Sequence, residues 1–159
     1  MKAAIIYHSH SGITKNVIQK IHDEISADII EVTPIHPYSS LMVIPKGCYR
    51  ALRGFHDSVL PEKIDVSAYD LLIIASPVWA GKPTPVINGG IEGLTGCQGK
   101  HGFVLLTCKS SESGEQALIS MVERLKAKGI SISGTVVLDQ AGSIDIETIQ
   151  TVIRDIASL

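Results

Sequence analysis

Three short segments carry the side chains that could bind a ligand in this chain of 159 residues. The first, Ser9-His10-Ser11-Gly12-Ile13-Thr14, lies between an apolar run and a predicted helix. Unpaired amide groups and the positive end of a helix dipole attract anions to such a turn, and hydroxyl groups can donate to phosphate oxygens. Gly12 lets the backbone approach a ligand closely. Residues 9–14 therefore predict a phosphate-binding loop, and the alternative is that Ser11 only caps the helix.

The other two segments also follow apolar runs. Residues 76–84 (SPVWAGKPT) contain the only tryptophan, and residues 107–110 are Thr-Cys-Lys-Ser. Trp79 is either a core residue or a platform for an aromatic ligand. Cys108 is expected to be a buried thiol rather than a redox-active one.

Several kinds of site are excluded by what the chain lacks. It has neither the triphosphate-binding G-x-x-x-x-G-K-[ST] nor the dinucleotide fingerprint G-x-G-x-x-G. No Ser-His-Asp order or carboxylate pair indicates hydrolysis, so no catalytic residue is predicted. His8 and His10 have no further ligand at metal spacing, and no metal site is expected. The three cysteines form no C-x-x-C, which argues against a disulfide framework and favours a reducing, cytoplasmic location.

The apolar pattern predicts the elements that must position these segments. Five runs are predicted strands: residues 3–7, 28–32, 71–75, 103–107 and 131–138. Helical stripes lie between them, with Val17, Ile18, Ile21 and Ile25 in one and Leu118, Met121, Val122 and Leu125 in another. A further stripe consists of Ile149, Val152, Ile153 and Ile156. This alternation predicts a single α/β domain over residues 1–159, with a doubly wound, five-stranded parallel sheet covered by helices on both faces.

Local signals also predict where the later helices begin. Ser113 and Gln116 have the spacing of a capping box, and Gly129 suits the residue after a helix end. Ser143 or Asp145 is the expected N-cap of the last helix.

Residues 33–68 form an unusually long connection, and such loops are usually functional or mobile. A short helix over residues 46–55 would place Lys46, Arg50 and Arg53 on one face. It would place Cys48, Leu52 and Phe55 on a second face that packs on the domain. The basic face is either solvated or a docking surface for an acidic redox partner.

The three segments together resemble the flavodoxins and flavodoxin-like proteins, which bind flavin mononucleotide (FMN). Ser9-x-Ser11-Gly12-x-Thr14 is similar to their phosphate loop, and the tryptophan segment occurs at the matching place in the strand order. The resemblance extends over essentially the whole chain. It implies strand order 2-1-3-4-5, with FMN at the point where the order reverses.

The resemblance also assigns the cofactor-binding residues. Ser9, His10, Ser11, Gly12, Ile13 and Thr14 would hold the phosphate. Pro77, Val78, Trp79, Ala80 and Gly81 would line the isoalloxazine ring, with Trp79 stacked on one face. Thr107, Cys108, Lys109 and Ser110 would border the other side.

The chain departs from the family pattern in four places. His10 and Ile13 replace polar residues of the phosphate loop, so backbone amides would contribute more of the binding. Ala80 follows Trp79 where the family often has a glycine whose peptide flips on flavin reduction, and alanine resists positive φ. Residues 109–114 contain no aromatic residue, which leaves one flavin face open or covered by a partner. The net charge of −2 is also less acidic than is usual for flavodoxins.

The resemblance implies an electron-transfer protein that shuttles electrons between redox partners. The alternatives are an NAD(P)H-dependent FMN or quinone reductase on the same fold, or a binding module without a cofactor. The near-neutral charge gives no nucleic-acid footprint, and no apolar run approaches the ~20 residues that span a bilayer. The oligomeric state is left open.

Overall fold

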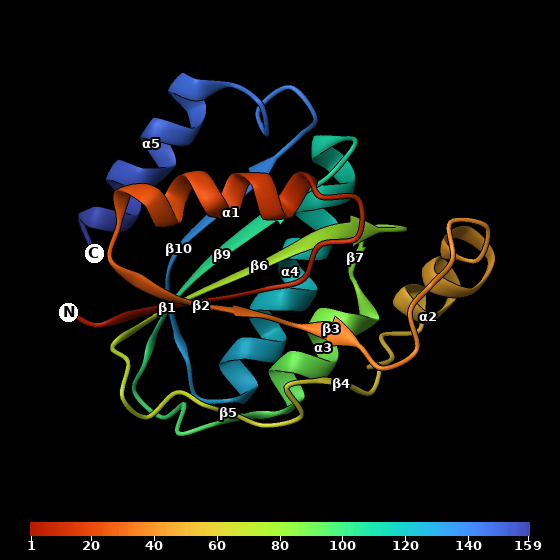
Figure 1. The fold of residues 1–159 in the computed structure, drawn as a ribbon, viewed down its shortest axis with the longest axis horizontal. Helices are drawn as coiled ribbons and strands as arrows, with labels where there is room; N and C mark the ends of the chain where they lie inside the picture. The colour runs from red at the N-terminus through yellow and green to blue at the C-terminus, as the bar shows by residue number, and fades with distance from the viewer.

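The computed structural model describes residues 1–159 and has three layers (Figure 1). The middle layer contains the parallel strands β1 (Ala3–Tyr7), β2 (Ala27–Glu31), β6 (Leu71–Trp79), β9 (His101–Thr107) and β10 (Ser131–Leu138). Their order is β2-β1-β6-β9-β10, which is 2-1-3-4-5 when these strands alone are numbered. The predicted fold class and strand order are confirmed.

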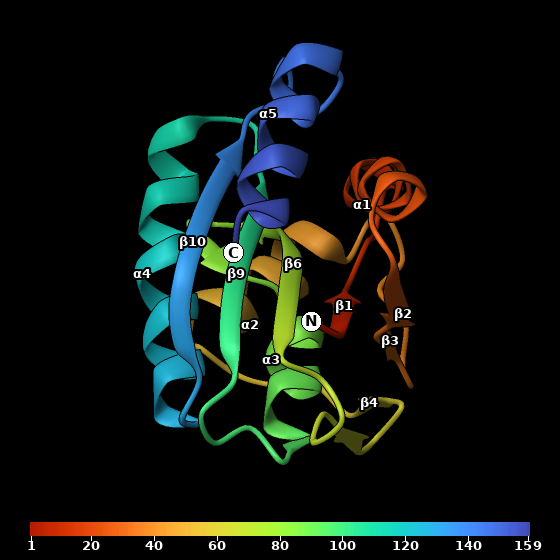
Figure 2. The same cartoon turned by 90° about the vertical axis from the view of Figure 1, so that its left-hand side faces the viewer.

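Helices cover both faces of the sheet (Figure 2). On one face, α1 (Ile13–Glu24) and α5 (Ile146–Ala157) pack on alternate strand residues such as Ile5 and Ile73. On the other face, α3 (Pro85–Glu92) and α4 (Ser111–Ala127) pack on Ile6 and Ile74. Because both faces are covered, the inner strands β1, β6 and β9 are largely apolar and buried, whereas the edge strands β2 and β10 contain exposed polar residues.

Strand β6 is longer than predicted. Residues 76–79 continue the strand beyond Ala75, since Pro77 still pairs with Thr107 of β9. The strand then turns back into β7 (Lys82–Pro83), which pairs antiparallel with it. The tryptophan segment is therefore a hairpin rather than a loop.

The helix ends differ partly from expectation. The prediction of a capping box at Ser113 is wrong: α4 begins at Ser111, and Ser110 precedes it as N-cap without a side-chain cap bond. Asp145 does cap α5, because its carboxylate accepts the Thr148 amide at 2.8 Å. Ile25 lies just past the end of α1 as its C-cap.

The long connection contains short pieces of regular structure. They are β3 (Thr33–Pro34), a π-helical stretch η1 (Val43–Cys48), α2 (Tyr49–Leu52), β4 (Val59–Leu60) and β5 (Ile64–Asp65). Strand β3 pairs with β4, and β5 pairs with β8 (Leu94–Thr95). Residues 38–57, between β3 and β4, form a lobe that stands out beside the sheet and carries α2 (Figure 1).

The short helix predicted over residues 46–55 is present, but its bounds are wrong, because helical structure runs from Val43 to Leu52. Helical structure ends at Leu52, so Arg53 and Phe55 do not share its faces. Leu52 and Phe55 are 58% and 39% exposed, and the residues that face the domain are Gly47 and Ala51. Small residues are buried here because the lobe backbone lies close to the domain surface.

None of the helices combines the length and the apolar character that crossing a membrane would require.

Candidate functional site

The three segments singled out in the sequence follow neighbouring strands of the sheet. Residues 9–12 follow β1, the β6–β7 hairpin extends the adjacent strand, and residues 108–110 follow β9. The hydroxyls of Thr14 and Thr107 are 2.8 Å apart and join the first segment to the third. The rings of His10 and Trp79, 5.5 Å apart between centroids, join the first to the second. All three segments thus meet at the carboxyl edge of the sheet, where open α/β sheets bind ligands.

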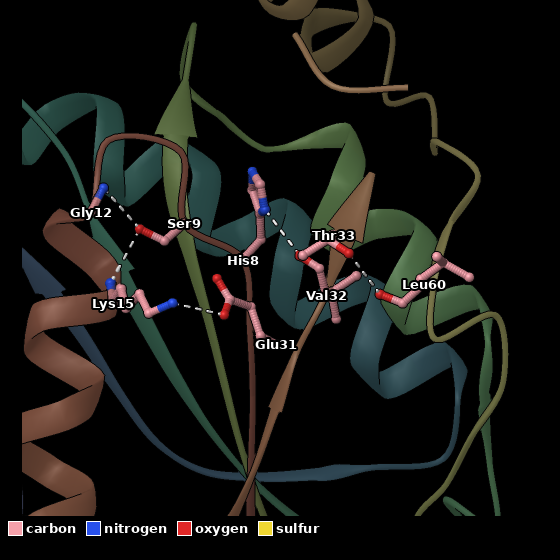
Figure 3. Close-up of polar contacts among 8 residues, drawn as sticks. All are labelled: His8, Ser9, Gly12, Lys15, Glu31, Val32, Thr33 and Leu60. Carbon is pink, nitrogen blue, oxygen red and sulfur yellow. Dashed lines mark hydrogen bonds and ion pairs between the residues drawn. The ribbon is translucent and has the colours of Figure 1, made fainter. Parts of the chain in front are cut away.

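The loop before α1 is folded around the side chain of Ser9 (Figure 3). Its hydroxyl oxygen accepts the amides of Gly12 and Lys15, each at 3.2 Å. Gly12 has a φ of 92° and no atom within 4 Å of where a Cβ would be, so the loop is open above it. Lys15 is paired with Glu31 at 3.0 Å.

The first turn of α1 keeps free hydrogen-bond donors. The amides of Ile13 and Thr14 donate to no protein group, and the one side chain that accepts an amide of this turn is Ser9, which bonds Lys15. The alternative role of Ser11 as the helix cap is therefore wrong, and its side chain is exposed. Free amides at a helix start, together with the helix dipole, form a site for an anion.

Thr14 and Thr107 lie inside this edge rather than on its surface. Thr14 is 1% exposed and Thr107 is 4% exposed. Their mutual hydrogen bond satisfies both buried hydroxyls and ties the start of α1 to the end of β9.

Trp79 is enclosed by protein groups. It is 8% exposed, and the rings of His10 and Tyr38 meet it edge-on, the latter at 5.4 Å between centroids. A Cβ on Gly47 would lie 2.8 Å from the indole ring, so only glycine fits there. The lobe thus covers the residue that the resemblance assigns to the flavin ring.

Ala80 and Gly81 form the two-residue turn of the β6–β7 hairpin. Their φ values are 50° and 71°, and Ala80 is the only non-glycine residue with positive φ. Positive φ at both turn positions matches the twist of a two-residue hairpin. Of the other hairpin residues, Pro77 and Val78 are half-buried.

The segment after β9 exposes Lys109 and Ser110 and partly buries Cys108. The Cys108 thiol is directed at the Leu138 carbonyl, 3.6 Å away, and burial raises its pKa. It is a packed thiol rather than a reactive one, as expected.

Tyr38, Gly47 and Asp57 near this edge were not identified from the sequence, and His8 was considered only as a metal ligand. Tyr38 donates to Asp57 at 2.6 Å, and Arg50 bonds the other oxygen of that carboxylate at 2.9 Å. This cluster joins the two ends of the lobe, since Tyr38 is its first residue and Asp57 its last. Burial and the Asp57 carboxylate raise the pKa of Tyr38 to about 12, so its hydroxyl remains a donor at neutral pH.

His8 is a buried residue between the loop and Trp79. Its pKa is lowered to about 4, because burial penalises the charged ring. A single histidine after an apolar strand has no local sequence pattern that would single it out. Tyr38 and Asp57 are 19 residues apart, and only the folded lobe brings them together.

Solved structures with this fold include several flavoproteins. A flavoprotein from Lactobacillus acidophilus in complex with FMN is 23% identical with a TM-score of 0.73, covering 86% of this chain and 92% of that one. A candidate flavoprotein from Bacteroides uniformis is 19% identical with a TM-score of 0.79 and coverages of 96% and 97%. A flavodoxin from Streptococcus pneumoniae is 14% identical with a TM-score of 0.63, covering 100% of both chains.

Sequence comparison assigns the family. No curated protein matches this chain. The family model described as flavodoxin matches residues 2–143, nearly the whole chain and all three segments of the site. The chain belongs to the flavodoxin family.

Proposed function

We propose that this protein binds FMN without a covalent bond and carries electrons between redox partners. The observation that carries the proposal is the meeting of three loops at one sheet edge, with free amides at Ile13 and Thr14. The family assignment and the FMN complex of the Lactobacillus acidophilus protein support it. A reducing cytoplasm suits its three free thiols.

The residues present fit the phosphate of FMN. The free amides lie at the positive end of α1, and the space above Gly12 is open. The exposed hydroxyl of Ser11 is available as a donor. His10 is exposed beside the loop, and the Ile13 side chain is 42% exposed and contributes its amide rather than a polar group.

The ring of the cofactor would lie against the hairpin and residues 107–110. Bound FMN supplies the electron chemistry, and the protein supplies orientation and electrostatics. Trp79 is the aromatic platform on the hairpin side. Tyr38 and Gly47 pack against the indole, so the lobe must move away from Trp79 before a flavin can stack on it.

The lobe is also our proposed docking surface for redox partners. No acidic residue occurs between Val32 and His56. Of its three cations, Arg50 is paired with Asp57, while Lys46 and Arg53 make no salt bridge. Exposed apolar side chains, among them Leu41 at 86% and Ile44 at 76%, lie on the same lobe. A partner with an acidic, partly apolar surface would be complementary to it.

Docking is tested with two small oxidants of opposite charge, ferricyanide and hexaamminecobalt(III). Replacing Lys46 and Arg53 by glutamine should slow the oxidation of the reduced holoprotein by ferricyanide at low salt but not at high salt. Oxidation by the cationic complex should not slow. The matched control replaces Lys20 and Lys126, which are exposed elsewhere. Unchanged ferricyanide rates at every salt concentration would contradict the proposal.

An NAD(P)H-dependent FMN or quinone reductase is the second candidate. One observation favours it: residues 109–112 are exposed and contain no aromatic side chain, which leaves room beside the flavin. The anaerobic holoprotein is mixed with NADPH or NADH. Persistence of the flavin colour indicates a carrier, and rapid bleaching without added reductase indicates the enzyme. Failure to bind any flavin would indicate the third alternative, a binding module without a cofactor.

A further inference from the structure

His8 has a ring nitrogen for which the protein provides no partner. The residue follows β1 and is 4% exposed. Its Nδ1 lies 3.1 Å from the Val32 carbonyl oxygen, which can only accept, so Nδ1 carries the proton (Figure 3). The other nitrogen, Nε2, is therefore an acceptor, and it is buried without a hydrogen bond.

Buried polar atoms in folded proteins nearly always have a hydrogen-bond partner, so this one requires an explanation. The neighbouring groups do not provide a donor. Trp79 meets the imidazole edge-on, 6.3 Å between centroids, and the Tyr38 hydroxyl donates to Asp57 instead. The donor must therefore come from outside the chain, as a bound water molecule or as a ligand.

The position of His8 indicates which part of a ligand that donor belongs to. The residue lies between the loop of Ser9, which precedes the free amides of α1, and Trp79 on the hairpin. A flavin nucleotide whose phosphate occupies the loop and whose ring contacts the hairpin must pass its ribityl chain between the two. That chain carries hydroxyl groups, whereas the ionised phosphate offers acceptors.

We propose that Nε2 of His8 accepts a hydrogen bond from a ribityl hydroxyl of bound FMN. The proposal rests on the proposed function, and it adds a polar contact to the sugar chain at a residue outside the phosphate loop. Trp79 meets the imidazole edge-on in this structure, and Tyr38 and Gly47 of the lobe pack against the indole. Because Nε2 is buried here, the groups around it must move apart for the ribityl chain to reach it.

The test compares three flavins that differ only in the side chain attached to the isoalloxazine ring. FMN has the ribityl chain and the phosphate, riboflavin has the chain alone, and lumiflavin has neither. His8→Leu should weaken the binding of FMN and riboflavin about tenfold to one hundredfold, the usual effect of losing one hydrogen bond in a buried site. The affinity for lumiflavin should stay within about twofold, the small residual effect expected at a site that it does not contact.

The matched control is His22→Leu. His22 also has a buried ring nitrogen without a partner, but it lies in the last turn of α1, at the opposite end of that helix from the site. This variant should leave all three affinities unchanged. An equal loss for lumiflavin in His8→Leu, or no loss for riboflavin, would overturn the proposal.

A measurement on the wild-type protein covers the case in which His8→Leu does not fold. The ¹⁵N resonance of His8 Nε2 should shift in the direction of a hydrogen-bonded acceptor on addition of riboflavin or FMN, whereas lumiflavin, which reaches only the neighbouring indole, should not shift it in that direction. If FMN binds and this resonance does not move, His8 is not a ligand-binding residue, while the proposed function stands. If wild type binds none of the three flavins, both proposals fail.

Discussion

Ala80 offers a test of backbone strain at the hairpin of the proposed site. Its φ of 50° lies in the left-handed region, which alanine resists because its Cβ approaches the following carbonyl. The side chain is exposed and makes no buried contact that a substitution would remove. Ala80→Gly therefore changes the backbone preference and little else.

The magnitude follows from two opposing effects. Relief of the left-handed conformation stabilises the folded state by about 1–2 kcal/mol. Glycine also makes the unfolded chain more flexible, which costs about 0.4–1 kcal/mol. The difference is a net stabilisation of roughly 0.8 kcal/mol, or a rise in melting temperature of about 2–3 °C for a domain of this size.

Urea unfolding of the apoprotein measures the change. The control is Ala68→Gly, at an exposed alanine without positive φ, which should destabilise by about 0.4–1 kcal/mol. Gly81→Ala should also destabilise, because φ is 71° and a Cβ would lie 2.6 Å from the Gln116 side-chain oxygen. If Ala80→Gly lost as much stability as Ala68→Gly, the argument from strain would be refuted.

Three further predictions concern the site. The free energy of unfolding should fall by up to about 3 kcal/mol as the pH drops from 6.5 to 4. The reason is that the pKa of His8 is lowered to about 4 in the folded protein, so the unfolded chain binds the proton more readily. His8→Phe should lose this part of the pH dependence, and an unchanged pH profile in that variant would contradict the prediction. Thr14→Val should destabilise the protein by about 1–3 kcal/mol in urea unfolding, since it leaves the buried Thr107 hydroxyl without its partner. A double variant that also carries Thr107→Val should recover part of this loss. No recovery would contradict a stabilising hydrogen bond between the two threonines. A cation ~6 Å from a reduced, anionic flavin stabilises it by at most ~3 kcal/mol at an effective dielectric near 20. Lys109→Gln should therefore lower the flavin reduction potential, measured by redox titration, by up to on the order of 100 mV. An unchanged potential would place the exposed Lys109 away from the ring.

The sheet could be predicted from the sequence because its signal is local. The inner strands are runs of apolar residues, as burial on both faces requires, and the edge strands keep shorter apolar runs. The strand order came from the family resemblance, since an apolar run does not indicate which strands lie beside it in the sheet. Helix α3 was not predicted, because Gly89 and Gly90 interrupt its apolar pattern. Those glycines are required by close contacts: a Cβ added at Gly89 would clash with the Asp57 carbonyl oxygen, and one at Gly90 would lie 2.8 Å from Val32.

The candidate site was predictable to a similar extent. Its three loops were found because hydroxyl, glycine and tryptophan residues occur directly after strands. The lobe was not, since its position depends on Tyr38, Arg50 and Asp57, which meet only in the folded chain. The same holds for Gly47 under Trp79, whose role is a contact between residues 32 positions apart.

A titration of the apoprotein with FMN and with riboflavin tests the central claim most directly. Trp79 is the only tryptophan, so its fluorescence reports binding at the hairpin, and the two ligands differ only in the phosphate. If residues 9–14 anchor that phosphate, FMN should bind much more tightly than riboflavin and quench the emission. Ser11→Ala should then weaken FMN by roughly 1–3 kcal/mol and leave riboflavin unchanged. Equal affinities for FMN and riboflavin, or unchanged fluorescence at saturation, would contradict the account.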